Sequence, residues 1–313
     1  MKVTHNMLAK DLRIMGEVYR IVMSAFPHLK KGSNPLKKKT RGNTDTTKST
    51  YQVYITREDG SELRLLVHKP KNYKGGKPGV LWIHGGGFAT GMPEMIYMSM
   101  ARVLLKECIV VTPEYTLSIE KPYPAALNDC FLALKWMHEH ADELQYNNDQ
   151  LFVGGESAGG NLAIALCLYA RDNSNIKIAC QMPLYPMIDD SMNTNSMKDN
   201  DAPVWNEDRN REAWKLYLDG LLEIPVYAAP ARETNYHNLP PCISFVGTIE
   251  PFYDETKVYI NNLQKHNIPT HFTEFAGAFH AFDMMVPWSK SAKAAKEFFL
   301  EHFDYACQHY RGK

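Results

Sequence analysis

A serine stands on a sharp turn near the middle of the sequence. The letters G-E-S-A-G at residues 155–159 follow an apolar run at 151–153 and open a segment of helical character. In this strand-turn-helix context the serine hydroxyl stands at the tip of a strained turn, and the flanking glycines let strand and helix pass closely. The start of a helix also favours negative charge nearby. Ser157 is therefore predicted to be a nucleophile for acyl transfer.

A second glycine-rich turn, H-G-G-G at residues 84–87, follows another apolar run at 79–83. Backbone N–H groups of such a loop can point at one oxygen atom and stabilise an oxyanion. The predicted donors are the N–H groups of Gly85 and Gly86, together with that of Ala158 after the serine. A phosphate-binding loop is the alternative, but neither G-x-G-x-x-G nor G-x-x-x-x-G-K-[ST] fits this segment or any other.

A serine nucleophile also needs a base. Of the 12 histidines, His280 is distinguished because it follows the last strand-like run, at 271–275. Its place after Ser157 in the chain is the order typical of hydrolases built on this kind of sheet. We therefore predict that His280 is the general base.

The carboxylate that orients the base is expected between Ser157 and His280, after the penultimate strand. Three acids follow that strand: Glu250, Asp254 and Glu255. The last two lie where the next helix should begin, and acids in a first helical turn commonly interact with the helix dipole. Glu250 is preferred as the acid, and Asp254 and Glu255 are its rivals.

These side chains need a scaffold that brings the ends of several strands together. Two strand-like runs, 51–55 and 63–68, surround a turn and predict a hairpin. Short apolar runs, expected to be strands buried on both faces, then alternate with helical segments, which predicts an α/β fold with a mostly parallel sheet between helices. The strands are expected at 80–83, 108–111, 151–153, 178–184, 242–246 and 271–275, and the helices at 94–106, 124–142, 158–171, 255–266 and 290–309.

Two stretches depart from this alternation. The first 26 residues carry apolar side chains at helical spacing and predict a helix ahead of the main fold. Residues 189–238 interrupt the order of strands and helices, and they read as an insertion over one edge of the sheet. Its aromatic residues Trp205, Trp214 and Tyr217 are interpreted as packing the insertion onto the core, outside the site.

Taken together, these motifs resemble the hormone-sensitive-lipase-like branch of the α/β-hydrolases, over about residues 50–310. The segment 113–126 is similar to the family's Y-R-L-A-P-E-x-P-F-P-A stretch, and Y-A-A-P at 227–230 resembles its junction between cap and core. The family's acid is usually aspartate in a D-P-[LF]-x-D-E stretch, where this chain has Glu250. Glutamate is one methylene longer and serves in other Ser-Glu-His triads.

The resemblance implies a serine carboxylesterase with an α/β-hydrolase fold, no cofactor and no metal. It also implies a helical cap made of residues 1–48 and a cap insertion at 188–235, over a core formed by 49–187 and 236–313. The substrates it implies are esters of short, acetyl-like acyl chains.

Charge and hydropathy limit the classes of molecule that the protein is expected to bind. There are 35 basic and 35 acidic residues, so the net charge is zero and binding to nucleic acid is not expected. No apolar run is long enough for a membrane span, and the first residues lack the apolar stretch of a signal peptide. We therefore expect a cytoplasmic protein that acts on a small ester. The family resemblance allows a homodimer, but the sequence does not set the oligomeric state.

Three alternatives stay open at this point. A peptidase or amidase can use the same three side chains, because the motifs do not define the leaving group. A catalytically silent binding protein on the same fold is disfavoured by the presence of both Ser157 and His280. A metal hydrolase is the weakest alternative, since His138 and His140 are two residues apart on an expected helix and point to different faces.

Overall fold

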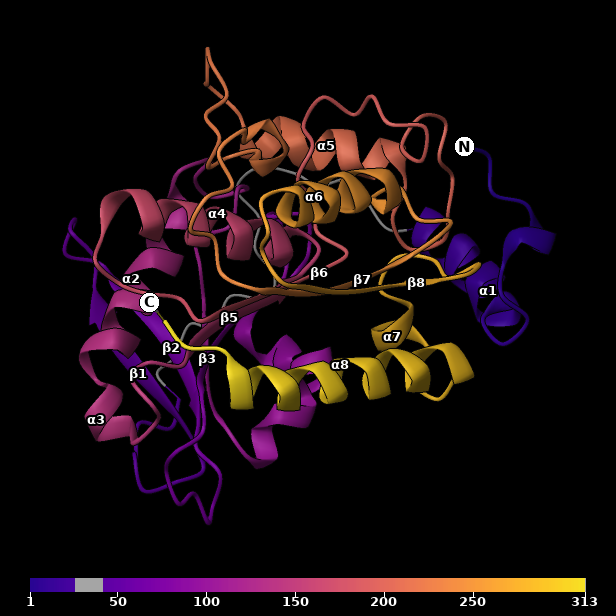
Figure 1. Ribbon diagram of the computed structural model, residues 1–313. Helices are drawn as coiled ribbons and strands as arrows, with labels where there is room; N and C mark the ends of the chain where they lie inside the picture. The colour runs from indigo at the N-terminus through magenta and orange to yellow at the C-terminus, as the bar shows by residue number, and fades with distance from the viewer. Residues whose placement is uncertain (26–41, 313) are drawn as a thin grey trace.

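The computed structural model describes residues 1–25 and 42–312. An eight-stranded sheet lies at its centre, in the order β1-β2-β4-β3-β5-β6-β7-β8 (Figure 1). The strands from β3 onward run parallel, whereas the hairpin β1–β2 joins β4 in antiparallel orientation. The strands are β1 (Thr50–Thr56), β2 (Glu62–His68), β3 (Gly79–Ile83), β4 (Ile109–Pro113), β5 (Leu151–Glu156), β6 (Cys180–Leu184), β7 (Cys242–Gly247) and β8 (Thr270–Phe275).

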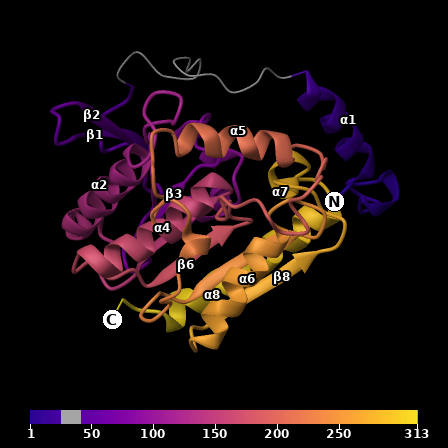
Figure 2. The ribbon, with the colours of Figure 1, turned by 90° about the horizontal axis from the view of Figure 1, so that it is seen from above.

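Helices cover both faces of the sheet (Figures 1 and 2). Helices α2, α4 and α6 lie on one face, and α8 lies on the other beside two 3₁₀ segments, η2 and η3. The helices of the described residues are α1 (Arg13–Ser24), α2 (Ala125–Glu139), α3 (Ala141–Leu144), α4 (Ala158–Asn173), α5 (Glu207–Tyr217), α6 (Tyr253–Lys265), α7 (Phe282–Met285) and α8 (Lys290–His309), with 3₁₀ segments η1 (His5–Met7), η2 (Pro93–Tyr97), η3 (Met100–Lys106) and η4 (Pro230–Arg232).

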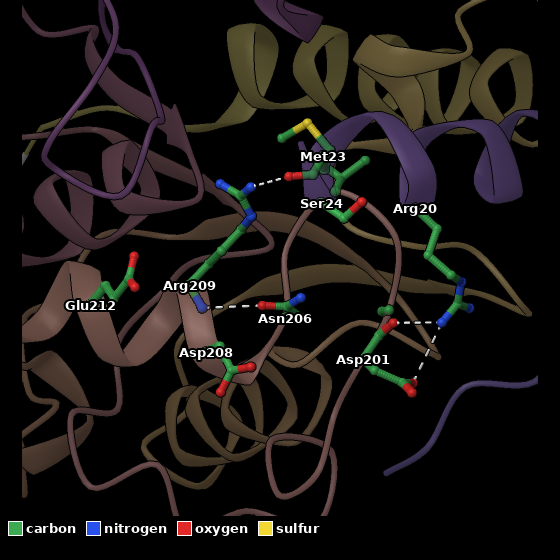
Figure 3. A pocket seen from close by; sticks show the side chains of 10 residues that line it. Arg20, Met23, Ser24, Asp201, Asn206, Asp208, Arg209 and Glu212 are labelled. Carbon is green, nitrogen blue, oxygen red and sulfur yellow. Dashed lines mark hydrogen bonds and ion pairs between the residues drawn. The ribbon is translucent and has the colours of Figure 1, made fainter. Parts of the chain in front are cut away.

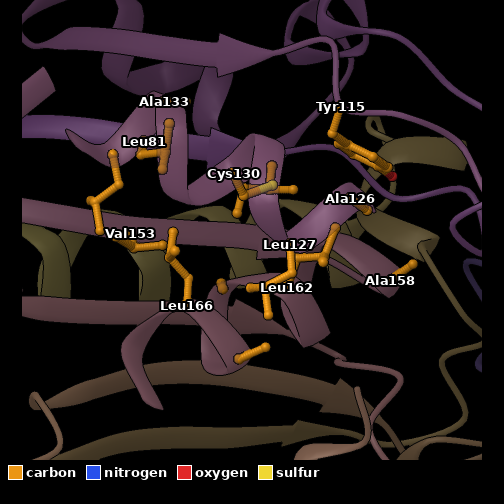
Figure 4. Packing of buried hydrophobic residues seen from close by; sticks show 14 of the residues in the cluster. Leu81, Tyr115, Ala126, Leu127, Cys130, Ala133, Val153, Ala158, Leu162 and Leu166 are labelled. Carbon is orange, nitrogen blue, oxygen red and sulfur yellow. The ribbon is translucent and has the colours of Figure 1, made fainter. Parts of the chain in front are cut away.

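The core on the α2 and α4 side shows why the apolar runs become strands. Leu81 of β3 and Val153 of β5 point to the same face, toward Ala133 of α2 and toward Leu162 and Leu166 of α4 (Figure 4). All five side chains are fully buried. Burying a leucine or valine side chain contributes about 1.5–3 kcal/mol. Strands β3 to β7 are buried on both faces along their whole length, as predicted.

Two predicted elements were wrong in detail. The run at 271–275 was expected to be buried on both faces, but β8 is only partly buried, because it is the edge strand and pairs with β7 alone. The expected helix at 94–106 is instead the two short 3₁₀ segments η2 and η3. Ser99 separates them, since its Oγ accepts a hydrogen bond from Ala101 N at 3.0 Å and starts a new turn there.

The N-terminal helix and the insertion meet above the carboxyl ends of the strands. Arg20 of α1 donates a hydrogen bond to the carbonyl oxygen of Asp201 at 2.8 Å, and Arg209 of α5 donates one to the carbonyl oxygen of Met23. Helix α1 also contacts the C-terminal end of α7, where Tyr19 Oη donates to the carbonyl oxygen of Met285 at 2.9 Å. Helix α1 thus contacts both the insertion and the end of α7. The division into a core and a two-part cap stays a prediction, and residues 26–41 of that cap lie outside the described chain.

No helix within residues 1–25 and 42–312 combines the length and the apolar character that crossing a membrane requires.

Candidate active site

Ser157 occupies the turn between β5 and α4. Its backbone has φ +59° and ψ −119°, a conformation that residues other than glycine rarely adopt. The neighbouring glycines are required by contact with β3: a Cβ would come within 2.4 Å of the Ile83 carbonyl oxygen at Gly155, and within 2.0 Å at Gly159. The sequence motif thus forms the strained turn that it predicts, with the serine at the carboxyl end of β5.

The structure brings Ser157, His280 and Glu250 into one hydrogen-bonded line. Ser157 Oγ lies 2.9 Å from His280 Nε2, and His280 Nδ1 lies 2.5 Å from Glu250 Oε2. A carboxylate can only accept a hydrogen bond, so Nδ1 carries a proton, and Nε2 of the neutral ring is then free to accept from the serine hydroxyl. The three side chains therefore stand in the arrangement that acyl transfer by a serine nucleophile requires.

The histidine is held by its surroundings as well as by the acid. The exposed fractions of Ser157, His280 and Glu250 are 5%, 4% and 0%. The rings of Tyr185 and Phe252 each lie 5.0 Å from the imidazole centroid, nearly perpendicular to it. Packing from two sides fixes the imidazole plane, so that Nε2 stays directed at the serine.

The other two acids of the segment after β7 bind the cap instead of the base. Asp254 Oδ2 accepts a hydrogen bond from Ser196 N at 2.8 Å. Glu255 Oε1 accepts one from Ile188 N at 2.7 Å, and burial raises the pKa of this carboxyl well above its usual range. Glu250 is thus the acid in contact with His280, and the rival Asp254 is engaged elsewhere.

Glu250 is one methylene longer than the usual aspartate, and a second hydrogen bond of its carboxylate shows how this length is accommodated. Its second oxygen, Oε1, accepts a hydrogen bond from Gly247 N at 2.8 Å, three residues earlier in the chain. The side chain therefore folds back over its own turn, which takes up the extra methylene. With both oxygens occupied, the carboxylate is fixed toward His280.

The H-G-G-G loop lies directly against the serine turn. A Cβ on Gly85 would stand 2.8 Å from the Glu156 carbonyl oxygen and 3.2 Å from Ser157 Cβ. Gly86 has φ +115°, which favours glycine. The backbone N–H groups of Gly85, Gly86 and Ala158 remain the candidate oxyanion donors, because the loop and the first residue of α4 adjoin the same hydroxyl.

The histidine of this loop has a structural task. His84 Nδ1 is 2.7 Å from the Gly85 carbonyl oxygen, and its ring stacks on Tyr115 at a centroid distance of 4.3 Å. Tyr115 Oη also donates a hydrogen bond to the His84 carbonyl oxygen at 3.0 Å. Burial lowers the pKa of His84 to about 4, so this imidazole is neutral and stabilises the shape of the loop.

Two buried acids beside the site were missed by sequence reasoning. Trp82 Nε1 donates a hydrogen bond to Glu156 Oε2 at 2.8 Å, and Tyr185 Oη donates one to Asp283 Oδ1 at 2.9 Å. Burial, followed by the charge of Asp283, raises the pKa of Glu156 to about 8, and burial raises that of Asp283 to about 6. The only sequence signal is that each lies within three residues of Ser157 or His280.

The raised pKa of Glu156 predicts a pH-dependent stability. The folded protein binds this proton more tightly than the unfolded chain, so the stabilisation is complete below the ordinary pKa of 4.5 and is lost as the pH rises through about 8. In Glu156→Gln the amide stays neutral and its oxygen still accepts from Trp82. The melting temperature of the variant minus that of the wild type should therefore be about 5 °C or more higher at pH 9 than at pH 5.

Differential scanning fluorimetry across this pH range measures the gain. Glu301→Gln, at an exposed position of α8, is the matched control and should follow the wild-type curve. Parallel curves for Glu156→Gln and the wild type would show that Glu156 does not hold its proton in the folded protein.

Comparison with known proteins relates this chain to hydrolases. A family model described as alpha/beta hydrolase fold matches residues 80–284. The chain is 30% identical to an arylesterase of Saccharolobus solfataricus over 251 residues, which are 76% of this chain and 78% of the relative. It is 28% identical to carboxylesterase NlhH of Mycobacterium tuberculosis over 244 residues, 74% of this chain and 76% of that protein.

A solved structure agrees over almost the whole length. A bacterial heroin esterase superposes with a TM-score of 0.81 and 26% identity, covering 98% of this chain and 99% of its own. The matched family segment includes the H-G-G-G loop, the serine turn, Glu250 and His280. The predicted fold is confirmed, and the chain belongs to the α/β-hydrolase family.

Proposed function

We propose that this protein hydrolyses carboxylic esters of short acyl chains through an acyl-enzyme on Ser157. The observation that carries the proposal is the hydrogen-bonded line from Ser157 through His280 to Glu250, beside the glycine loop. Ester hydrolysis as the class of reaction is confirmed by the comparisons, since the related proteins are carboxylesterases and arylesterases. The short acyl chain and the roles of individual residues are our proposal.

The geometry supports the following sequence of steps. His280 Nε2 takes the hydroxyl proton while Ser157 Oγ attacks the ester carbonyl carbon, and the carbonyl oxygen becomes an oxyanion facing the N–H groups of Gly85, Gly86 and Ala158. The C–O bond to the alcohol then breaks, and the departing oxygen takes the proton from His280. Water repeats the sequence on the acyl-enzyme, which releases the acid and restores the serine.

Glu250 acts by stabilising the imidazolium that exists between these proton transfers. Its carboxylate accepts the hydrogen bond from His280 Nδ1–H and places a negative charge next to the positive ring. Each oxyanion donor contributes about 3 kcal/mol in other serine hydrolases.

The setting that we propose is a reducing, cytoplasmic one. All six cysteines are free thiols, and five of them are buried in the core. Free buried thiols are typical of proteins from reducing compartments. A small ester is the proposed partner of the site, and a homodimer is retained as a proposal from the family resemblance.

The function is tested with 4-nitrophenyl acetate, butyrate and decanoate, with butyranilide as the matching amide, and with a fluorophosphonate probe located by mass spectrometry. We expect kcat/KM for butyrate to exceed that for decanoate by about tenfold or more. The anilide should react far more slowly, and the probe should be found on Ser157. Faster turnover of the anilide would favour an amidase. Absence of both turnover and label would instead indicate a silent binding protein.

A further inference from the structure

Trp205 belongs to the cap insertion and lies next to the reacting groups. It lies in the insertion just before α5, with 9% of its surface exposed. A Cβ on Gly87 would come within 2.4 Å of Trp205 Cη2, so the indole is in direct contact with the glycine loop. The indole and the imidazole of His280 have centroids 6.3 Å apart. One aromatic side chain thus borders both the oxyanion loop and the base.

The indole is held in place. Trp205 Nε1 donates a hydrogen bond to Asn210 Oδ1 at 3.2 Å, and Asn210 is a fully buried residue in α5. Ala213, one turn further along the same helix, also borders Gly87: its Cβ would lie 3.2 Å from a Cβ added there. Asn210 of α5 therefore holds the indole of Trp205 against the glycine loop.

The residues before and after Trp205 in the chain border a different cavity. Val204 and Asn206 line a cavity of about 400 Å³ between α1 and α5, where Arg20 and Arg209 also lie (Figure 3). The indole between them contacts Gly87 and His280 instead. Residues 204–206 therefore border this cavity through Val204 and Asn206, and the glycine loop through the indole of Trp205.

The position of the ring indicates which part of an ester it meets. The departing alcohol must lie at His280 Nε2, which protonates it, and the carbonyl oxygen must lie at Gly85 and Gly86. The indole borders both groups: Trp205 Cη2 lies against Gly87, the glycine that follows the two proposed oxyanion donors, and the ring centroid is 6.3 Å from that of His280. An acyl chain that extends from the carbonyl carbon past Gly87 would meet the indole.

We propose that Trp205 is a specificity-determining residue that limits the length of the acyl chain. This inference rests on the proposed ester hydrolysis at Ser157. A rigid ring against the loop leaves room for a short acyl group and excludes the later carbons of a long one. Removing the indole opens space beside Gly87 in which a longer chain can lie.

The test is a graded series, Trp205→Phe, Trp205→Leu and Trp205→Ala, with 4-nitrophenyl esters from acetate to decanoate. The ratio of kcat/KM for decanoate to that for butyrate should rise along the series and reach about tenfold above the wild type in the smallest variant. The phenylalanine and leucine variants keep the test informative, because a large-to-small change in a packed site can prevent folding.

Trp214→Leu is the matched control. Trp214 is a buried tryptophan of the same cap, and its ring packs against Phe88 and Tyr217 at centroid distances of 5.6 and 6.1 Å. Its loss should leave the chain-length ratio within about twofold of the wild type. Acetates of alcohols of increasing size form a second series, in which the Trp205 variants should keep the wild-type order.

Several outcomes overturn the proposal. An unchanged decanoate-to-butyrate ratio in a folded, active Trp205→Leu protein removes the size limit from this residue. A changed order of alcohols with an unchanged order of acyl chains places the indole on the leaving-group side instead. In both cases the wild type still turns over esters, so ester hydrolysis stands. A wild type that turns over no ester overturns the proposed function together with this inference.

Discussion

Replacing Ser157 by alanine should lower kcat for 4-nitrophenyl butyrate by about 10⁴- to 10⁶-fold. In the proposed mechanism this hydroxyl forms the covalent intermediate, and its Oγ lies 2.9 Å from His280 Nε2. The residual rate comes from the glycine loop and from substrate binding, which the variant keeps. Initial rates at saturating ester, after removal of any contaminating esterase, measure the loss.

The variant is expected to fold normally. Alanine must adopt the same φ of +59° as serine, so the backbone strain of the turn does not change. Ser174→Ala, which removes a hydroxyl bonded to the Ala170 carbonyl oxygen just after the end of α4, is the control and should retain wild-type activity. Activity above about one hundredth of the wild type in a folded Ser157→Ala protein would contradict the assignment of the nucleophile.

Replacing Glu250 by glutamine should lower kcat by about 10³- to 10⁴-fold, because an amide can donate to Nδ1 and thereby stabilise the wrong tautomer of His280. The new side chain has nearly the same shape, and it can still accept the hydrogen bond from Gly247 N. The loss should therefore appear in kcat with little change in melting temperature. Steady-state kinetics and thermal unfolding of the same preparation separate the two effects.

Asp254→Asn is the matched comparison, four residues away in the same segment. Its carboxylate accepts from Ser196 N and makes no contact with His280, so kcat should stay within about fivefold of the wild type. The melting temperature should fall by a few degrees, since an interaction between the cap and the core is weakened. A larger loss of kcat in Asp254→Asn than in Glu250→Gln would make Asp254 the catalytic acid.

The sequence predicts the site well where chemistry limits local structure. Gly155 and Gly159 are imposed by the close approach of β3 to the serine turn, so a short motif is enough to reveal the turn. The sheet follows from apolar runs that must be buried on both faces. Parallel strands then bring Glu250 and His280 to the same edge as Ser157 without any further information.

The remaining features depend on contacts between distant segments. β8 reads like its neighbours in sequence, but it lies at the edge of the sheet and is therefore only partly buried. Glu156 is an unspecified position of the serine motif until Trp82 is placed against it. Trp205 looks like a residue that merely packs the cap, and only the fold brings its ring to Gly87, some 120 residues earlier in the chain.

The hydrogen bonds of Asp254 and Glu255 also affect how chimeras of this enzyme and its relatives should be designed. Both acids bind backbone N–H groups of the insertion, and both directly follow the turn that carries Glu250. A chimera that takes residues 188–235 from a relative would place a foreign backbone on these two carboxylates. The unit that can be transplanted intact therefore extends beyond the cap and includes residues 250–255 of the core.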